Sequence, residues 1–487
     1  MTTRTLSAIL LLTMAAPIAA QDTPRAQQPT DFKGVELKKK APVSSDILRV
    51  TFRRPAESKL ANGMTLMLLE EHRSPTVQVE IAVPASSLND PEGVPISAAT
   101  TALMRLGTKT RDARTIAETI AGLGATINFN VGDRYAYARL STLTENLDQV
   151  LALLSDMLFN PTFPQDEIDK WKNQQLSSLQ QIRAQPEFLA AERFAQAMYP
   201  ADRRSFVAPT VQGVNSITRD AIVEYYNRVY RPTGGRITVL GDTTAGDIAP
   251  RLEKLLSGWT GTGSTPPSLT LPGAATGRRV ILVHRPNSVQ TALYVGNHAI
   301  DRLSPDYIPV QVLNRVLGGG PSSRLFRNIR EEKGYTYGIS SGFSATRYLN
   351  HFASQTSVRT EVTMEALREV LNEFADIRNR PVPAEELDNA KRALVASFAL
   401  STETQGTALS LATQVKDYGL PADYWDTYPE KIAAVTAADV QRVAQKYIPV
   451  DNIVIVAVGD ATKIRQPLAT FGTIEEWDTE GRKAATN

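Results

Sequence analysis

The sequence has 487 residues, 42% apolar and 21% charged, a composition typical of a folded protein of roughly two to four domains. The formal net charge of +2 leaves no broad basic field to neutralise phosphates, which argues against nucleic acid as a partner. The absence of cysteine excludes disulfides, thiol nucleophiles, thiolate metal ligands and a lipidated cysteine anchor.

The first residues are typical of an export signal. Arg4 precedes an apolar run that ends at Ala16 and is followed by PIAAQ, so we predict a signal peptide over residues 1–20. The run is too short to span a bilayer, and no later stretch reaches about 18 uninterrupted apolar residues. These features predict an exported, soluble periplasmic protein with no membrane span. Residues 21–45 are polar and are expected to form a flexible N-terminal arm.

The rest of the chain reads as a tandem repeat. Residues 46–256 and 278–475 each begin with a strand pair, continue with a helix, a turn and a helix, and close with a helix and a strand that ends in Gly-Asp. Residues 257–277 carry no charge and are dominated by Gly, Ser, Thr and Pro, which indicates a linker. We therefore predict an N-terminal domain, a linker, a C-terminal domain and a tail over residues 476–487.

The periodicities within each repeat predict an α+β fold. The strands alternate apolar and polar residues, and the long helix of the first repeat carries apolar residues at helical spacing, including Ile168, Trp171 and Leu179. Half-buried strands with helices on one side imply two layers. We expect two homologous two-layer α/β halves, arranged as a clamshell around a cleft that can hold a large ligand.

The stretch REEKGYTYG in the second repeat joins a helix end to a strand. Ser322 is the expected N-cap of the helix, and Gly334 is the expected left-handed residue that ends it. Strand alternation then places Tyr337 on the same face as Ile339. Arg330 and Tyr337 are thereby expected to project together, as donors suited to a peptide carbonyl that gains negative charge under attack by water. Each residue alone is equally explained by the helix dipole or by strand propensity.

Three consecutive glycines precede this helix, in the segment LGGGPSSRLF. The segment lacks the Gly-Lys-Ser/Thr ending of a phosphate-binding loop and the spacing of a dinucleotide fingerprint, which argues against nucleotide binding. Gly318, Gly319 and Gly320 are expected to form either a loop that a peptide substrate approaches closely or a plain tight turn.

Five motifs, in order along residues 49–472, resemble the insulinase-like metallopeptidases, also known as the pitrilysin, mitochondrial-processing-peptidase or M16 family: LANGMTLMLLEEHRSP, FNPTFPQDEID, LGGGPSSRLF, REEKGYTYG and VGD. The resemblance implies a zinc site formed by an inverted His-x-x-Glu-His motif on the first long helix and a glutamate on a later helix. In this sequence the matching positions are Ala98, Thr101 and Ala102, with Trp171 and Ser178 at the distal helix. None of these side chains can bind zinc or act as its base, so the motif is degenerate and we expect no metal in this chain.

The histidine content leads to the same expectation without the resemblance. The chain has four histidines, and no two of them lie within one helical turn: His72, His284, His298 and His351. A catalytic zinc needs at least three protein ligands, which here would come from distant histidines and carboxylates. A stand-alone peptidase with such an unusual site is one alternative that the sequence leaves open.

Some members of the resembled family divide their work between two chains. One chain holds the zinc, and the other has lost it but keeps an arginine and a tyrosine that reach the scissile bond. Arg330 and Tyr337 match that pair. The resemblance therefore implies a pseudopeptidase subunit, inactive alone, that supplies Arg330 and Tyr337 as catalytic groups and the glycine triplet for substrate binding to a zinc-bearing homologue that hydrolyses peptides. The other alternative is a structural homologue with no role in chemistry.

Overall fold

The computed structural model describes residues 50, 53–200, 203–265, 269, 277–448 and 450–483. The predicted signal peptide 1–20 and the predicted arm 21–45 lie outside these residues. Within the described ranges, none of the helices combines the length and the apolar character needed to cross a bilayer.

The first half is built on a six-stranded sheet with the strand order β1-β2-β6-β3-β5-β4. Its strands are β1 (Ala56–Lys59), β2 (Thr65–Glu70), β3 (Thr76–Pro84), β4 (Thr126–Val131), β5 (Tyr135–Leu143) and β6 (Arg236–Gly241). Its helices are α1 (Ile96–Leu103), α2 (Ala113–Gly122), α3 (Leu147–Phe159), α4 (Gln165–Arg183), α6 (Val211–Ser216), α7 (Arg219–Val229) and α8 (Ala245–Leu255), with short 3-10 turns η1 (Ser87–Asn89), η2 (Thr144–Asn146) and η3 (Arg203–Ser205). Strands β2 and β6 are parallel, and the other neighbours are antiparallel.

The second half has its own six-stranded sheet, in the order β12-β7-β11-β8-β10-β9. Its strands are β7 (Arg279–His284), β8 (Gln290–His298), β9 (Thr336–Ala345), β10 (Asn350–Arg359), β11 (Val454–Gly459) and β12 (Thr473–Trp477). Its helices are α9 (Tyr307–Leu317), α10 (Thr363–Asn379), α11 (Ala384–Thr402), α13 (Tyr428–Ala434), α14 (Ala437–Tyr447) and α15 (Ala461–Leu468), with the 3-10 turn η5 (Thr360–Val362) and the π-helix η4 (Phe326–Glu332).

The two sheets repeat one topology, which confirms the predicted mixed α/β fold of two related halves. Apart from the edge strands β1 and β12, the strand orders correspond: β2-β6-β3-β5-β4 in the first half matches β7-β11-β8-β10-β9 in the second. The edge strands next to β2 and β7 differ. Strand β1 precedes β2 in the chain and pairs with it antiparallel, whereas β12 comes from the end of the second half and pairs parallel with β7.

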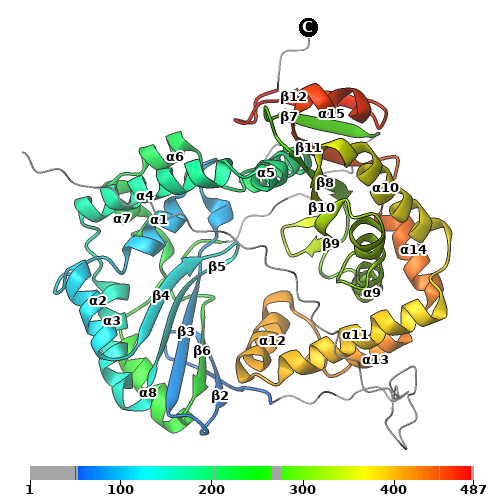
Figure 1. The fold of residues 1–487 in the computed structure, drawn as a ribbon. Helices are drawn as coiled ribbons and strands as arrows, with labels where there is room; N and C mark the ends of the chain where they lie inside the picture. The colour runs from blue at the N-terminus through cyan, green and yellow to red at the C-terminus, as the bar shows by residue number, and fades with distance from the viewer. Residues whose placement is uncertain are drawn as a thin grey trace, which may run out of the picture. The chain divides into compact units, whose positions relative to one another are not determined.

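Each half has its own hydrophobic core on one face of its sheet. In the first half, alternate residues of β3 from Val77 to Val83 are buried against helices that include α1, α3 and α4. The predicted helical spacing is confirmed there, because Ile168, Trp171 and Leu179 are the buried residues of α4. In the second half, α9, α10 and α14 cover the corresponding face (Figure 1).

Two helices contact the sheet of the half to which they do not belong. Helix α5 (Pro186–Met198) follows α4 in the first half but packs on β8 and β11 of the second half (Figure 1). Helix α12 (Gln405–Tyr418) follows α11 in the second half and contacts β6 of the first. Two side chains of α12 form ion pairs with the first half, Asp417 with Arg236 at 2.7 Å and Lys416 with Glu57 at 2.8 Å. The halves therefore exchange one helix each.

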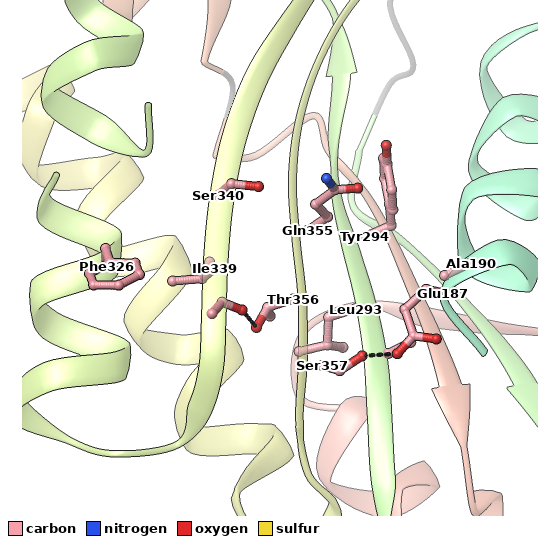
Figure 2. A pocket seen from close by; sticks show the side chains of 12 residues that line it. Glu187, Ala190, Leu293, Tyr294, Phe326, Ile339, Ser340, Gln355, Thr356 and Ser357 are labelled. Carbon is pink, nitrogen blue, oxygen red and sulfur yellow. Dashed lines mark hydrogen bonds between the residues drawn. The ribbon is translucent and has the colours of Figure 1, made fainter. Parts of the chain in front are cut away.

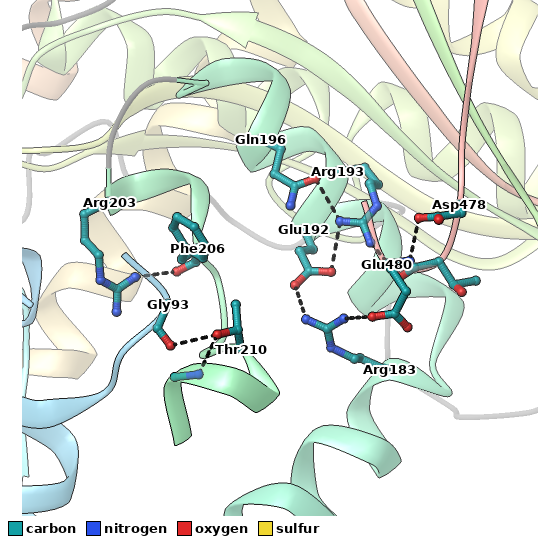
Figure 3. A network of polar contacts seen from close by, with 12 residues as sticks. Gly93, Arg183, Glu192, Arg193, Gln196, Arg203, Phe206, Thr210, Asp478 and Glu480 are labelled. Atoms are coloured by element: carbon teal, nitrogen blue, oxygen red, sulfur yellow. Dashed lines mark hydrogen bonds and ion pairs between the residues drawn. The ribbon is translucent and has the colours of Figure 1, made fainter. Parts of the chain in front are cut away.

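A buried arginine fastens α5 to the end of the second half (Figure 3). Arg193 is 0% exposed, and its guanidinium donates to Gln196 Oε1 at 2.8 Å and to the Thr479 carbonyl oxygen at 2.7 Å. Arg183 contacts Glu192 and Glu480 in the same network. The segment predicted as a tail from residue 476 thus begins inside strand β12 and continues as a turn packed on α5.

The first part of the predicted linker packs on the first half. Trp259 is buried and donates its indole N–H to the Tyr230 carbonyl oxygen at 3.2 Å, and Thr262 forms a bridge with Thr233. Most of the remaining linker, residues 266–268 and 270–276, lies outside the described residues. The predicted domain boundaries stay predictions.

Two histidines lie opposite each other where α5 ends on the second sheet. His298 of β8 pairs in register with His351 of β10, and His351 Nδ1 lies 3.2 Å from the hydroxyl of Tyr199, the residue after α5. The Arg204 guanidinium stacks on the Tyr199 ring. Burial, with a smaller contribution from His298, lowers the pKa of His351 to about 4.

We expect this junction to lose stability in acid. The folded-state pKa of His351 lies below its ordinary value of 6.5, so the folded protein favours the neutral imidazole. The contribution of His351 to the free energy of unfolding is therefore fully present above pH 6.5 and is lost as the pH falls from there through 4. The loss between pH 7.5 and 4.5 should be about 2–3 kcal/mol. Urea unfolding of wild type and His351→Gln at both pH values measures it, and the variant should show the smaller pH dependence. Gln355→Asn, an exposed change on the same strand, should keep the wild-type dependence; equal pH dependence in H351Q and wild type contradicts the assignment.

Candidate functional site

The three positions that match the zinc motif lie on α1. Ala98 is exposed, Ala102 is half-buried, and Thr101 is 2% exposed. The Thr101 hydroxyl lies 2.6 Å from the Ser97 carbonyl oxygen and 2.7 Å from the Tyr230 hydroxyl, so it is occupied by internal hydrogen bonds. At the distal helix α4, Trp171 packs in the core of the first half and Ser178 is exposed. Thr101 and Trp171 thus serve as packing in the first half, whereas Ala98 and Ser178 lie at the surface.

An acidic side chain lies at the start of α1, but it is engaged in the fold. Asp90 is 6% exposed and accepts hydrogen bonds from the Ser97 hydroxyl at 2.6 Å and from the Ser97 N–H. Burial raises the pKa of Asp90 to about 6, against the opposing effects of the Ser97 hydrogen bonds and of Arg203. Within the described ranges, no three His, Asp or Glu side chains are grouped to hold a metal ion. The side chains at the matching positions of α1 and α4 do not fit a zinc ion, because none of them is an imidazole or a carboxylate.

Arg330 lies on η4, which is a π-helix rather than the regular α-helix that its sequence predicts. The Lys333 N–H donates to the Asn328 carbonyl oxygen, five residues back, at 3.1 Å. Ser322 is not the N-cap, because Ser323 precedes the first helical turn and donates its hydroxyl to the Gly320 carbonyl oxygen at 2.6 Å. π-helical turns are rare and occur often at functional sites.

Carboxylates of the neighbouring helices hold η4 in place. The Asn328 amide donates to Glu373 at 2.7 Å and to Glu369 at 3.1 Å, both on α10. Arg324, one turn earlier, contacts Asp376 of α10 and Glu386 of α11. These contacts lie on the inner side of η4 and leave Arg330 exposed on the outer side.

The Arg330 side chain is oriented by two contacts. Its Nε donates to the Tyr337 carbonyl oxygen at 3.1 Å, and its guanidinium carbon lies 4.9 Å from the centre of the Phe326 ring. Among the described residues, its terminal nitrogens have no acceptor. The sequence analysis did not single out Phe326, although a residue four positions before Arg330 on a helix is the expected neighbour of its side chain.

Tyr337 lies at a β-bulge on the edge strand β9. Thr356 pairs with Ile339 and Val358 pairs with Thr336, so Tyr337 and Gly338 together lie opposite one residue of β10. Threonine hydroxyls hold the bulge: the Gly338 N–H donates to Thr336 Oγ1 at 3.1 Å, and the Gly338 carbonyl oxygen accepts from Thr336 Oγ1 and Thr356 Oγ1, each at 2.9 Å.

The structure of this corner overturns one expectation and confirms another. Ile339 is buried, but Tyr337 is 93% exposed, so the two side chains do not share a face as strict alternation predicts. Gly334 does adopt the predicted left-handed conformation, with φ of 61°. The structure brings Arg330 and Tyr337 together at this corner, both exposed to solvent.

The glycine triplet approaches other parts of its own half. A Cβ on Gly318 would lie 2.3 Å from Ser341 Oγ of β9, and one on Gly320 would lie 2.6 Å from Arg315 Nη1. The Gly318 carbonyl oxygen accepts from the Ser341 N–H at 3.1 Å. Internal contacts therefore account for the small size of Gly318, whereas the flexible end of Arg315 does not require glycine at 320. The predicted role of the triplet in substrate binding stays a prediction.

Thr101 occupies the position that matches the glutamate of the zinc motif. The substitution Thr101→Val tests whether this side chain now stabilises the fold. The change keeps the shape of the side chain but leaves the buried Tyr230 hydroxyl without this partner, so the free energy of unfolding should fall by about 1–3 kcal/mol. Thr101→Ser retains the hydroxyl and is the matched control in the same urea titration. A valine variant as stable as wild type is the contrary outcome.

Comparison with known proteins agrees with this reading of the fold. Residues 66–205 match the family model described as insulinase (peptidase family M16), and residues 216–394 match the model described as peptidase M16 inactive domain. This chain belongs to the M16 peptidase family. The second description applies to the domain that carries Arg330 and Tyr337.

The related proteins carry two kinds of name. A Bacillus subtilis protein named uncharacterized zinc protease YmxG is 26% identical over 314 residues, which are 62% of this chain and 73% of that protein. A Helicobacter pylori protein named non-peptidase homolog YmxG is 24% identical over 404 residues, which are 81% of this chain and 91% of that protein. The crystal structure of a peptidase M16 inactive domain from Pseudomonas fluorescens matches with a TM-score of 0.76 at 25% identity, over 83% of this chain and 98% of that one.

Proposed function

We propose that this chain is the exported, metal-free subunit of a two-chain M16-type zinc peptidase. In this proposal Arg330 and Tyr337 bind and polarise the carbonyl of the scissile peptide bond. A zinc-bearing homologue supplies the metal, the base and the attacking water. The chain alone is inactive, as the name non-peptidase homolog states for its H. pylori relative.

The observation that carries the proposal is the contrast between helix α1 and the corner between η4 and β9. On α1, every position that would bind zinc holds an alanine or a threonine, and Thr101 is engaged with Tyr230. On the corner between η4 and β9, Arg330 and Tyr337 are adjacent and exposed. Helix α1 offers no zinc ligand at these positions, whereas the corner between η4 and β9 presents two hydrogen-bond donors.

The geometry of the second corner suits donors that act on a carbonyl. Arg330 is held by its Nε and by the Phe326 ring, so its terminal nitrogens are oriented before substrate arrives. Donors that are already in place cost no reorganisation when negative charge develops on the carbonyl oxygen. An aromatic side chain exposed as fully as Tyr337 is consistent with a surface that meets a substrate or a second chain.

The test is a peptidase assay of this chain mixed with a zinc-bearing M16 homologue encoded in the same genome. Removing one oxyanion donor typically lowers kcat about 10²- to 10³-fold, so Arg330→Ala and Tyr337→Phe should each lower kcat to that extent. Arg327→Ala is the matched control, because Arg327 is exposed on the same π-helix and pairs with Glu386. Unchanged turnover with both R330A and Y337F would exclude the catalytic role and favour a purely structural subunit.

Metal analysis separates the proposal from a stand-alone peptidase. The isolated chain should contain far less than one equivalent of zinc, since the positions of α1 and α4 that match the zinc motif hold no metal ligand. It should also show no chelator-sensitive peptidase activity without its partner. Stoichiometric zinc in the purified chain contradicts the proposal.

A further inference from the structure

Pockets lie on the faces of both sheets that point away from the hydrophobic cores. One of about 400 Å³ lies beside Tyr337 on the second sheet, between α5 and the strands β9 and β10 (Figure 2). Its one charged side chain, Glu187, already accepts a hydrogen bond from the Ser357 hydroxyl at 2.5 Å. This pocket belongs to the surroundings of the site described above. Another pocket of about 370 Å³, here called the α12 pocket, lies between α12 and the first sheet.

The sheet side of the α12 pocket is polar. On β6, Ile237 and Val239 lie in the core, so Thr238 between them faces the pocket. The register of the sheet places Thr238 opposite Glu80 of β3, and Glu80 opposite Arg139 of β5. Polar side chains from three adjacent strands therefore form one row across this side of the pocket.

Helix α12 forms the other side of the pocket with one of its faces. The residues of this face recur at helical spacing and are mostly polar: Gly406, Leu409, Ser410, Thr413, Gln414 and Asp417. Within the described ranges, no side chain of α12 belongs to the hydrophobic core of the first half. A helix that packs on a sheet normally buries an apolar stripe against it, so packing does not explain this polar face.

The charged groups that line the α12 pocket are paired with one another. Arg139 Nε lies 2.6 Å from Glu80 Oε2, and Arg236 Nη1 lies 2.7 Å from Asp417 Oδ1. The two cations and the two anions balance, so a charged ligand meets no free opposite charge among the lining residues. Burying an unpaired charge costs free energy, and the pocket therefore favours a neutral ligand.

Neutral polar side chains in the lining are left without partners. Thr238 is 5% exposed, and its hydroxyl makes no hydrogen bond within the part of the chain that the structure describes. The same holds for the side-chain amides of Gln78 and Gln414. Arg236 Nε is also buried without a partner among these residues. Such groups gain free energy when they are paired, so the set favours a ligand that both donates and accepts hydrogen bonds.

The position of the pocket favours a ligand that binds to side chains rather than to the backbone. Strands β3, β5 and β6 pair with neighbours inside the sheet, so an extended peptide cannot add a strand to them. The hydroxyl groups of a sugar both donate and accept hydrogen bonds, as amide and hydroxyl side chains do, and they carry no charge. The volume of about 370 Å³ lies within the range of roughly 300–1,000 Å³ that is typical of small-molecule sites.

We propose that the α12 pocket binds a neutral saccharide of one or two rings, held by Thr238 and Gln78 of the first sheet and by Gln414 of α12. The ligand contacts both halves of the chain, because α12 belongs to the second half and the sheet to the first. The inference is independent of the proposed function, since neither Arg330 nor Tyr337 lines this pocket.

The experiment is a saturation-transfer NMR titration of the full chain with a panel of neutral sugars: glucose, galactose, mannose, N-acetylglucosamine, maltose and N,N′-diacetylchitobiose. At least one of them should bind. Its amino and uronic-acid derivatives keep its size but carry a charge, and they should bind about tenfold or more weakly. A longer oligosaccharide of the same sugar that binds equally well identifies the end of a glycan chain as the ligand, and one that does not bind identifies a free sugar. Both results agree with the proposal.

Thr238→Val removes the hydroxyl and keeps the shape of the side chain. It should lower the affinity for the sugar about three- to tenfold without lowering the melting temperature, because the hydroxyl has no partner in the described protein. Thr142→Val is the matched control. Thr142 is 3% exposed, its hydroxyl is also buried without a partner among the described residues, and it does not line the pocket. This variant should keep the wild-type affinity.

Gln414→Met tests the same pocket from the side of α12. Removing the amide should lower the affinity to a similar extent. Gln405→Met is its control, because Gln405 is half-buried on the same helix and lies outside the lining. Melting curves establish that all four variants fold.

Three results overturn the proposal: no signal from any neutral sugar, equal binding of the charged derivatives, or full affinity in both T238V and Q414M. An alanine-serine-glycine octapeptide is included in the same titrations. A signal from this peptide that T238V removes, with no signal from a sugar, assigns the pocket to a peptide and also overturns the proposal. None of these results changes the turnover expected for R330A, so failure of this inference and failure of the proposed function are distinguishable.

Discussion

Each sheet has two faces to bury, and the helices of its own half cover only one of them. The second face of the second sheet is apolar over β7, β8 and β11, and α5 of the first half covers this part. Helix α12 contacts the first sheet in return. Apolar area on that scale is among the largest favourable contributions to folding, so the exchange of helices holds the halves to each other more firmly than a linker can. The pocket beside Tyr337 exists because α5 covers part of this face and leaves the strands β9 and β10 open.

The two related halves differ at the corner that joins a helix to the third strand of the repeat. In the first half, the corner after α1 joins the regular helix α2 to β4, whose pairing has no register shift, and α1 itself presents alanine and threonine at the positions that match the zinc motif. In the second half, the equivalent corner has a π-helix, a bulge and two exposed donors. Both irregularities change the direction in which a side chain points without changing the order of the strands. A fold common to many proteins can in this way lose one site and keep another.

Local sequence patterns predicted much of this molecule. The two related halves, the buried face of α4 and the left-handed Gly334 all follow from periodicity or from the chemistry of single residues. The irregular features depend on residues far away in the chain. The π-helix is held by Glu369 and Glu373 of α10, and the bulge is defined only by its register with β10. The amphipathic pattern of α5 predicts a buried face but not that the opposing surface belongs to the other repeat. The juxtaposition of Arg330 and Tyr337 was predicted, but the direction of Tyr337 and the pocket beside it required the tertiary structure.

The contact between Arg193 and the Thr479 carbonyl oxygen joins residues 286 positions apart. During synthesis, α5 emerges from the ribosome long before the strands on which it packs. Until residues 478–481 have followed, the Arg193 charge has no carbonyl to receive it, and the apolar side of α5 remains exposed to water. Contacts of such long range form late and slowly. Helix α5 therefore reaches its final packing only after the second half has been made, and its apolar side is the surface that a chaperone would shield during this interval.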